Sequence, residues 1–349
     1  MTLSLSSPTL RLRQAFTISR GSRTEQRTTI VALDDGEGRV GYGEVADNPY
    51  YTQARPETVA AVLRGLRAVL AHADPDDPAA LFAACARLVD GNYFALSALD
   101  MAAHDLAARR ATRPLYDYWG YDWDPDRVPV SNYTLSIGDP GAVLAQALAN
   151  PWPGYKVKLG GGADLETVAR LRAELPDVRL CVDANAAWDL REAFAKTVAL
   201  ARHGVAFVEQ PCPRGAFAET RDLRARLRAE LGEGAPPLVA DEDCQTESDV
   251  AACAGVFDLV NVKLAKCGGP TPALRMVAGA RARGLGVMFG CMVESSYAIG
   301  VLRHFAAVAD FVDLDGHLLI GNDPATGIAF RADGRPARPV GVGSGVAGV

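Results

Sequence analysis

The sequence predicts an α/β protein, a (β/α)8-type barrel with an N-terminal α+β capping domain. Eight short apolar runs follow one another between Val128 and Asp315, about 20 to 35 residues apart. Each of the first seven is followed by an Ala/Leu/Arg-rich stretch of helical character, which gives the order strand, helix, strand. The chain of 349 residues is long enough for such a barrel and a second, smaller domain.

The eight runs are short, and several are rich in Val, as expected of buried strands. In order, they are VPVSNYTL from Val128, YKVKLG from Tyr155, RLCVDAN from Arg179, VAFVEQP from Val205, PLVADED from Pro237, DLVNVKL from Asp258, LGVMFGCM from Leu285 and FVDLDG from Phe311. Seven of them end in charged or polar residues. Because the carboxyl ends of barrel strands converge on one mouth, these residues predict the place of an active site.

The residues before the barrel predict a separate α+β unit. The segment RTTIVALDDGEGRVGYGEVA alternates apolar and polar residues on both sides of a turn around Asp34-Asp35-Gly36, which is typical of a β-hairpin. Helical periodicity follows over 56–73, 78–90 and 95–110.

We therefore divide the chain into a capping domain (1–125), the barrel (126–325) and a C-terminal tail (326–349). Two predicted loops of the first domain, Ser19–Arg27 and Asp47–Pro56, carry arginines and tyrosines and could cap the barrel mouth. The alternative is that they are ordinary solvated loops. The final residues of the Gly/Pro-rich tail are expected to have little order.

Composition argues against several classes of function. The net charge is −6 and the 42 acidic residues are spread along a chain without a basic run, so nucleic acid is not an expected partner. No secretory leader and no run of 18 apolar residues is evident, which argues against a membrane protein. The seven cysteines lack CxxC spacing and are expected to be free thiols. These features predict a cytoplasmic protein and leave a homo-oligomer open.

Three acidic residues stand at the ends of neighbouring predicted strands: Asp183, Glu209 and Asp241. Carboxylates without His or Cys partners favour Mg²⁺, or Mn²⁺ in its place, over zinc. A single Asp at such a junction is more often a helix cap. Three in succession at one level of a barrel favour a metal site.

Lysines stand at the ends of two predicted strands on opposite sides of the barrel. Lys156 and Lys158 are two residues apart and emerge on the same side of their strand, and Lys263 ends a strand four positions around the ring. A nearby dication would lower the pKa of such lysines toward that of a general base. Two bases flanking a carbon beside a metal-held carboxylate favour a racemase or epimerase that works through an enediolate. For Lys266 we expect a loop or phosphate-type contact, with a role as a third base left open.

Asp313 and Asp315 share one face of the last predicted strand. Two carboxylates there would be costly to bury unless they meet a cation, and a substrate ammonium group is a good candidate. The alternative is that one of them caps a helix or pairs with an Arg or Lys of a neighbouring loop.

These motifs resemble those of the enolase superfamily, in its muconate-lactonizing-enzyme-like subgroup. The resemblance covers nearly the whole chain and rests on K-x-K at Lys156 to Lys158, DAN at Asp183, EQP at Glu209, ADE at Asp241 and K-x-x-K-x-G-G from Lys263. It implies a capping domain whose loops close over the barrel and Mg²⁺ held by the three carboxylates. It also implies that Lys158 and Lys263 are paired acid/bases and that Lys156 is an electrostatic helper.

Within that subgroup the chain looks most like the dipeptide epimerases, the L-Ala-D/L-Glu type among them. The shared features are D-x-D at Asp313 and Asp315, GCM at Gly290 to Met292 and RGSR at Arg20 to Arg23. The resemblance implies that Asp313 and Asp315 bind the α-ammonium of a dipeptide, that Met292 contacts the substrate and that Arg23 contacts an acidic side chain. Asp243 departs from the family by replacing a common Ser, and its carboxylate either alters metal affinity or contacts solvent.

The sequence thus predicts a Mg²⁺-dependent dipeptide epimerase that inverts the α-carbon of the C-terminal residue of a dipeptide such as L-Ala-L-Glu. A second hypothesis keeps the enolate and changes its fate, as in a cycloisomerase, a dehydratase, a succinylbenzoate synthase or an N-acylamino acid racemase. Those reactions do not need a paired acid for an ammonium group. A third hypothesis, a catalytically silent barrel that binds a small molecule, is disfavoured by the presence of all three carboxylates and both lysines.

Overall fold

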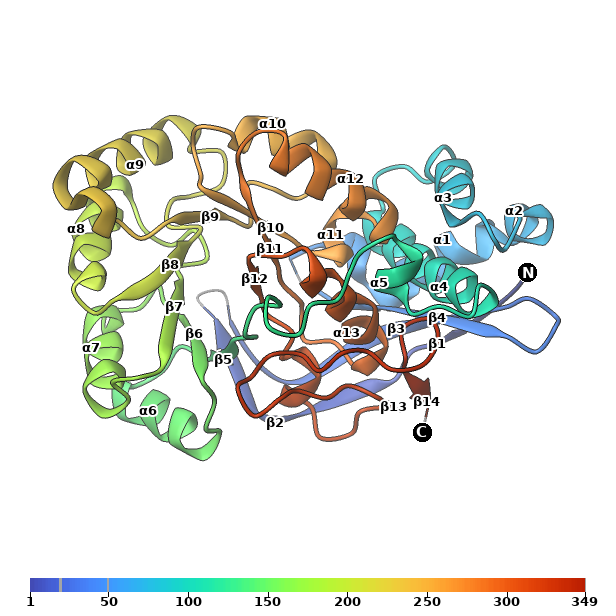
Figure 1. The fold of residues 1–349 in the computed structure, drawn as a ribbon, viewed down its shortest axis with the longest axis horizontal. Helices are drawn as coiled ribbons and strands as arrows, with labels where there is room; N and C mark the ends of the chain where they lie inside the picture. Colours follow the sequence, from blue (N-terminus) through green and yellow to red (C-terminus); the bar gives the residue numbers. More distant parts are fainter. Residues whose placement is uncertain (19–20, 49, 349) are drawn as a thin grey trace.

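The predicted barrel is confirmed by the computed structural model, which describes residues 1–18, 21–48 and 50–348 (Figure 1). In the described residues, eight parallel strands lie side by side in sequence order. They are β5 (Tyr133–Leu135), β6 (Gly154–Lys158), β7 (Arg179–Asp183), β8 (Val205–Glu209), β9 (Leu238–Ala240), β10 (Leu259–Val262), β11 (Gly286–Phe289) and β12 (Phe311–Val312). A parallel bridge between Ser131 and Val312 joins the two edges of this sheet.

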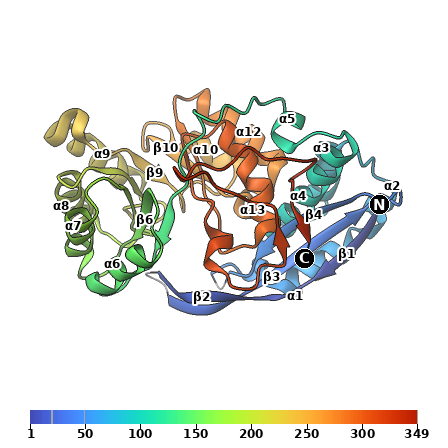
Figure 2. The same ribbon diagram turned by 60° about the horizontal axis from the view of Figure 1, so that its bottom comes forward.

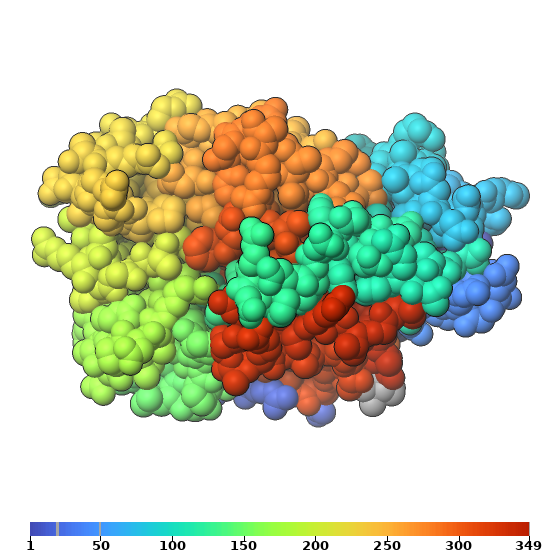
Figure 3. All heavy atoms as spheres, in the orientation of Figure 1, coloured from blue at the N-terminus to red at the C-terminus, as the bar shows by residue number. Residues whose placement is uncertain are grey.

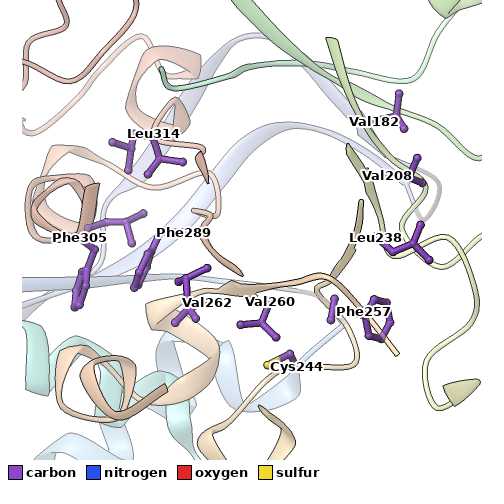
Figure 4. Close-up of a cluster of buried hydrophobic side chains, with 14 of the residues drawn as sticks. Val182, Val208, Leu238, Cys244, Phe257, Val260, Val262, Phe289, Phe305 and Leu314 are labelled. Carbon is purple, nitrogen blue, oxygen red and sulfur yellow. The ribbon is translucent and has the colours of Figure 1, made fainter. Parts of the chain in front are cut away.

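Helices connect the strands, and most of them cover the outside of the barrel. They are α6 (Pro140–Ala149), α7 (Asp164–Glu174), α8 (Leu190–Ala201), α9 (Phe217–Leu231), α10 (Val250–Cys253), α11 (Leu264–Cys267), α12 (Pro270–Arg281) and α13 (Ser296–Leu302), with 3₁₀ helices η2 (Gly232–Gly234), η3 (Glu247–Asp249), η4 (Arg303–Ala307) and η5 (Gly316–Leu319). Alternate strand residues such as Val182 and Val208 point toward them and form the main core (Figure 4). In that core Phe289 stacks on Phe305, with ring centroids 4.4 Å apart.

The capping domain combines an antiparallel sheet with a helical layer. Its elements are β1 (Thr2–Ser6), β2 (Thr9–Ile18), β3 (Gly21–Asp34), β4 (Val40–Ala46), η1 (Thr52–Ala54), α1 (Pro56–Gly65), α2 (Arg67–His72), α3 (Pro78–Ala86), α4 (Tyr93–Arg110) and α5 (Leu115–Tyr118). The predicted hairpin is the antiparallel pair of β3 and β4. Helix α4 lies so close to β4 that a Cβ at Gly43 would stand 2.1 Å from the carbonyl oxygen of Ala98, so only glycine fits there.

One predicted loop of the capping domain is a strand instead. Residues 21–27, which the sequence placed in a loop, form the first half of β3 and pair with β2; residues 19–20, including Arg20, lie outside the described residues. Figure 2 shows β2 reaching from the capping sheet toward the part of the barrel that holds β6 and α6. Thr17 of β2 donates its N–H to Ser136 Oγ at 3.2 Å and accepts the N–H of Ile137 at 3.0 Å. This hairpin therefore lies against the loop that follows β5.

The C-terminal segment is packed, so the expectation that its final residues have little order is wrong as far as Gly348. These residues lie between the barrel and the capping domain, red in Figure 3. Strand β14 (Ala347–Gly348) pairs with β13 (Ala325–Thr326), and Val346 is buried. The Gly/Pro composition gave no sign of these long-range contacts. The division at residues 125 and 325 stays a prediction.

Arg303 fixes this segment to the barrel, and its loss should destabilise the protein. Its side chain is only 2% exposed and donates to the carbonyl oxygens of Gly327 and Ser344, both at 2.8 Å. In Arg303→Met those two acceptors lose their partner, at about 1 to 3 kcal/mol each. Urea unfolding should therefore show a free energy of unfolding lower by about 2 kcal/mol or more. The matched control Arg281→Met removes an exposed pair with Asp310 and should cost about 1 kcal/mol or less; equal losses in both variants would contradict the anchoring role.

Two further expectations concern the whole chain. All seven cysteines are free, and six of them are buried, as the sequence predicted. Among the described residues, none of the helices combines the length and the apolar character that crossing a membrane would require.

Candidate active site

The polar side chains predicted from the strand ends form one layer inside the barrel. Below them lies an apolar floor that contains Cys181, Phe207, Val239, Leu259 and Met288. Asp183, Glu209 and Asp241 each stand two residues after one of these floor residues, namely after Cys181, Phe207 and Val239, respectively. Because successive strand residues alternate between the two faces of the sheet, the floor and the charged layer both point into the barrel.

A cavity of about 430 Å³ opens above this layer, a size typical of small-molecule sites. The predicted site residues that line it are Arg23, Lys156, Lys158, Asp241, Lys263, Met292, Asp313 and Asp315. Asp183 and Glu209 are fully buried beneath them. The structure thus brings all the predicted site residues to one place, while their roles stay predictions.

Lysine and carboxylate groups alternate in the charged layer. Lys156 Nζ lies 2.5 Å from Glu209 Oε2, 2.8 Å from Asp313 Oδ2 and 3.3 Å from Asp183 Oδ2. Lys158 Nζ donates to Asp183 Oδ2 at 2.6 Å. The chain has only five lysines, and four of them stand in this layer. Lysine, unlike arginine, can lose its proton in a protein, so this concentration favours proton transfer over simple charge balance.

The carboxylates hold the buried lysines as ammonium groups. Burial by itself lowers the pKa of Lys156, but the charges of Asp313 and Glu209 outweigh it and raise the pKa well above the usual range. The pKa of Lys263 is raised in the same way, with Asp241 as the main attracting charge. Burial, together with repulsion from Asp183, raises the pKa of Glu209 to about 7. A lowered lysine pKa, as a general base needs, therefore requires a cation that takes over the charge of these carboxylates.

The donor set fits a hard divalent cation. Asp183, Glu209 and Asp241 present only oxygen ligands from adjacent strands, without His or Cys. Glu209 Oε2 is buried and accepts no regular hydrogen bond in the described part of the chain; its neighbour is the ammonium of Lys156, at 2.5 Å. No three His, Cys, Asp or Glu side chains among the described residues are already gathered as metal ligands, because the ammonium of Lys156 lies among the carboxylates. A bound cation would therefore compete with this lysine for the same oxygens.

Lys266 contacts a predicted metal ligand, which corrects the expected loop or phosphate-type contact. It is buried in α11, donates to the main-chain oxygen of Asp241 at 3.0 Å and forms an ion pair with Asp241 Oδ1. The other carboxylate oxygen of Asp241 accepts from Lys263 at 3.0 Å. Asp241 is thus held between two lysines.

Asp313 and Asp315 differ in their surroundings. Asp313 pairs with Lys156 and accepts from Asn132 Nδ2 at 2.8 Å, so it has a lysine partner, although this lysine lies on strand β6 and not on a loop as the alternative had it. Asp315 accepts the N–H of Thr134 at 2.7 Å and has no cationic side chain within 4 Å among the described residues. Burial and the charge of Asp313 raise the pKa of Asp315 to about 6. Of these two acids, Asp315 is therefore the one without a cationic partner among the described residues.

The rim of the cavity comes from the capping domain. Phe16, Ile18, Ser22 and Arg23 of the β2–β3 hairpin line it, and so do Asn48, Tyr50 and Tyr51 from the second predicted loop. The prediction that these segments cap the barrel mouth agrees with this arrangement. The Arg23 guanidinium carbon lies 5.7 Å from the Phe16 ring centroid, with no acidic side chain within 4 Å in the described residues. Burial lowers the pKa of Arg23, so this cation would gain from an anionic partner.

Sequence reasoning missed several polar residues of the site. Asn261 in β10 donates to Glu209 Oε1 at 2.8 Å, and Asn132 donates to Asp313. Asn261 stands two residues before Lys263 in DLVNVKL, so a polar residue inside an apolar run was the available signal. Cys291 and Thr134 also line the cavity; Cys291 lies within the GCM motif, but no local pattern marks Thr134.

The comparisons with known proteins agree with this architecture. Residues 142–347 match the family model described as enolase C-terminal domain-like. Residues 1–120 match the N-terminal domain model of mandelate racemase and muconate lactonizing enzyme. The chain therefore belongs to the enolase superfamily, in its mandelate racemase/muconate lactonizing enzyme group.

Within this superfamily many of the similar proteins are dipeptide epimerases. An L-Ala-D/L-amino acid epimerase of Maribacter sp. is 37% identical, with 99% of both chains covered. An L-Ala-D/L-Glu epimerase of Bacteroides thetaiotaomicron is 35% identical, with 91% of this chain and 81% of the relative covered. The dipeptide epimerase of Cytophaga hutchinsonii, solved with Mg and D-Ala-L-Val, superposes with a TM-score of 0.91 at 26% identity, covering 99% of this chain and 95% of that chain. These similarities place the chain in the dipeptide epimerase family, a family of isomerases.

Proposed function

We propose that this protein is a Mg²⁺-dependent dipeptide epimerase that inverts the α-carbon of the C-terminal residue. The observation that carries the proposal is the placement of Lys158 and Lys263 in one cavity, on strands β6 and β10. These strands are four positions apart in the ring, so the two amines approach a bound carbon from opposite sides. Inversion needs such an arrangement, because the proton must leave one face and return to the other.

The residues of the charged layer have distinct tasks in this reaction. Asp183, Glu209 and Asp241 would hold the cation. When bound, it supplies positive charge that stabilises the carboxylate side of the deprotonated substrate. Lys158 or Lys263, as the neutral amine, takes the α-proton, and the other, as the ammonium, returns a proton from the opposite face. Lys156 keeps its proton through its ion pair with Asp313 at 2.8 Å, because Asp313 is not one of the proposed metal ligands, and it adds positive charge beside the reacting carbon.

The ends of the cavity would orient the dipeptide. Asp315, supported by Asp313, faces the α-ammonium, while Arg23 faces the side chain of the C-terminal residue. Met292 supplies an apolar contact between them. Arg23 favours an acidic side chain such as that of L-Ala-L-Glu. We also propose that the enzyme works in the cytoplasm, because free buried thiols suit a reducing compartment.

Proton NMR in D₂O tests the proposal. The purified enzyme with Mg²⁺ should remove the α-proton signal of the C-terminal residue from accepted L,L-dipeptides and produce the diastereomer. Isotope exchange and inversion on N-acetylamino acids alone would instead favour an N-acylamino acid racemase. A panel without any exchange would contradict epimerisation.

Arg23→Met should change the preference among dipeptides. A hydrogen bond between charged groups contributes about 1.5 to 3 kcal/mol, which corresponds to about 10- to 100-fold in kcat/KM. We expect a loss of this size for L-Ala-L-Glu and a much smaller one for L-Ala-L-Gln, measured by NMR or a coupled assay. The control is Arg27→Met. Arg27 lies on the same strand as Arg23, but it pairs with Glu57 and does not line the cavity. Equal losses for both substrates would show that Arg23 does not contact the side chain.

A further inference from the structure

A residue with an unusual backbone conformation follows directly after one of the predicted metal ligands. Gln210, the residue after Glu209, has a φ of +36°. A non-glycine residue in this region costs energy and persists only where its surroundings fix it. The side-chain contacts of Gln210 therefore indicate what stabilises the backbone at the end of β8.

The amide of Gln210 bridges two neighbouring strand ends. Its Oε1 accepts the backbone N–H groups of Asp241 at 3.0 Å and of Asp243 at 3.2 Å. Its Nε2 donates to the carbonyl oxygen of Cys212 at 3.1 Å and to Asp243 Oδ2 at 2.8 Å. Gln210 thus connects the end of β8 to the backbone that carries Asp241.

Asp243 completes this connection with both of its carboxylate oxygens. Oδ2 accepts from Gln210, and Oδ1 accepts the N–H of Gly215 at 2.6 Å. The residue is only 5% exposed, so the alternative of a solvent contact is excluded. Both oxygens are used within the protein, so the carboxylate joins the loops after β8 and β9.

We propose that Asp243 is a positioning residue for the metal site: it fixes Gln210 and thereby the backbone of Asp241. The inference rests on the proposed function, in which Glu209 and Asp241 hold Mg²⁺. A serine, the common family residue, has a single short hydroxyl and cannot accept from both Gly215 and Gln210. This chain therefore uses a carboxylate to hold together the two loops that follow two of its metal ligands.

Two substitutions separate positioning from bulk stability. Asp243→Ser restores the family residue and leaves one of the two donors without an acceptor. Asp243→Asn keeps the shape but sets an amide NH₂ against either Gly215 N or Gln210 Nε2. Turning the Gln210 amide over does not help, because its own NH₂ would then face the N–H groups of Asp241 and Asp243. Groups that orient metal ligands in this way typically change metal affinity 10- to 100-fold.

The experiment is Mg²⁺ titration calorimetry on the full-length protein without substrate, with thermal unfolding of each variant. Asp105→Asn is the matched control, because both carboxylate oxygens of Asp105 likewise accept hydrogen bonds, from the backbone N–H groups of Tyr42 and Ser344, far from the cavity. We expect the Kd for Mg²⁺ to rise about tenfold or more in both Asp243 variants and to stay unchanged in Asp105→Asn, although all three lower the Tm.

The outcomes distinguish this inference from the proposed function. An unchanged Kd in folded Asp243→Asn or Asp243→Ser, with only the Tm lowered, would overturn the positioning role while leaving the epimerase proposal intact. A wild-type protein that does not bind Mg²⁺ would overturn both. Weaker Mg²⁺ binding in the variants, combined with no dipeptide turnover by the wild type, would support the positioning role of Asp243 and refute only the proposed class of substrate.

Discussion

Replacing either Lys158 or Lys263 by methionine should abolish epimerisation, with kcat reduced about 10³-fold or more. Methionine keeps much of the length of the side chain but cannot carry a proton. Each variant retains only one of the two proposed acid/base amines, so only one face of the substrate α-carbon can still exchange its proton. Inversion requires both faces and stops in either variant.

The two variants should differ in which epimer they deuterate. One variant should exchange the α-proton of the L,L-dipeptide in D₂O without forming the diastereomer, and the other should do so with the L,D-dipeptide. Separate NMR time courses from each epimer measure this directly. A variant that exchanged both epimers at the wild-type rate would refute the two-base assignment.

Both variants are expected to fold. Asp183 keeps Lys156 at 3.3 Å when Lys158 is lost, and Asp241 keeps Lys266 when Lys263 is lost. The control is Lys196→Met. Lys196 is the lysine that does not stand in the charged layer, and it pairs with Asp164 outside the cavity. It should retain the wild-type kcat.

Local periodicity is enough to predict the charged layer. The period of two along a strand, together with the convergence of parallel strand ends, is sufficient to place Asp183, Glu209 and Lys263 in one layer. The same rule sets Lys156 and Lys158 on one side of β6, and both line the cavity.

Features that depend on contacts between distant segments are not predictable in this way. The partner of Asp243 is Gly215, 28 residues away, and only the packed loops bring them together. Arg303 holds Ser344 across 41 residues, so the ordered C-terminal segment could not be read from its Gly/Pro composition. The raised pKa of Lys156 likewise depends on three carboxylates from three other strand ends. Each of these features arises from the closed barrel rather than from any one strand.

Asp315→Asn should be the second most damaging change, and its effect should depend on the substrate. Leaving a buried substrate ammonium without its carboxylate costs about 3 to 5 kcal/mol, or more than 100-fold in kcat/KM for a dipeptide. An N-acetylamino acid has no ammonium group, so any turnover of such a substrate should be unaffected or should rise. The ratio of the two kcat/KM values, measured for wild type and variant, is the diagnostic quantity.

The pH dependence gives an independent check on the same residue. Because burial and Asp313 raise the pKa of Asp315 to about 6, the carboxylate is charged above that pH and is neutralised as the pH falls through it. In the wild type, kcat/KM for a dipeptide should therefore decline below about pH 6, and it should also decline above about pH 8, where the α-ammonium of the substrate loses its proton. Asp315→Asn should lose the acidic decline that belongs to this group and weaken the alkaline one, because a neutral amide no longer favours the ammonium form of the substrate. If the variant retained both declines and wild-type kcat/KM, the substrate ammonium would be bound by another residue. Asp313, which pairs with Lys156 in this structure, would then have to be tested as its partner.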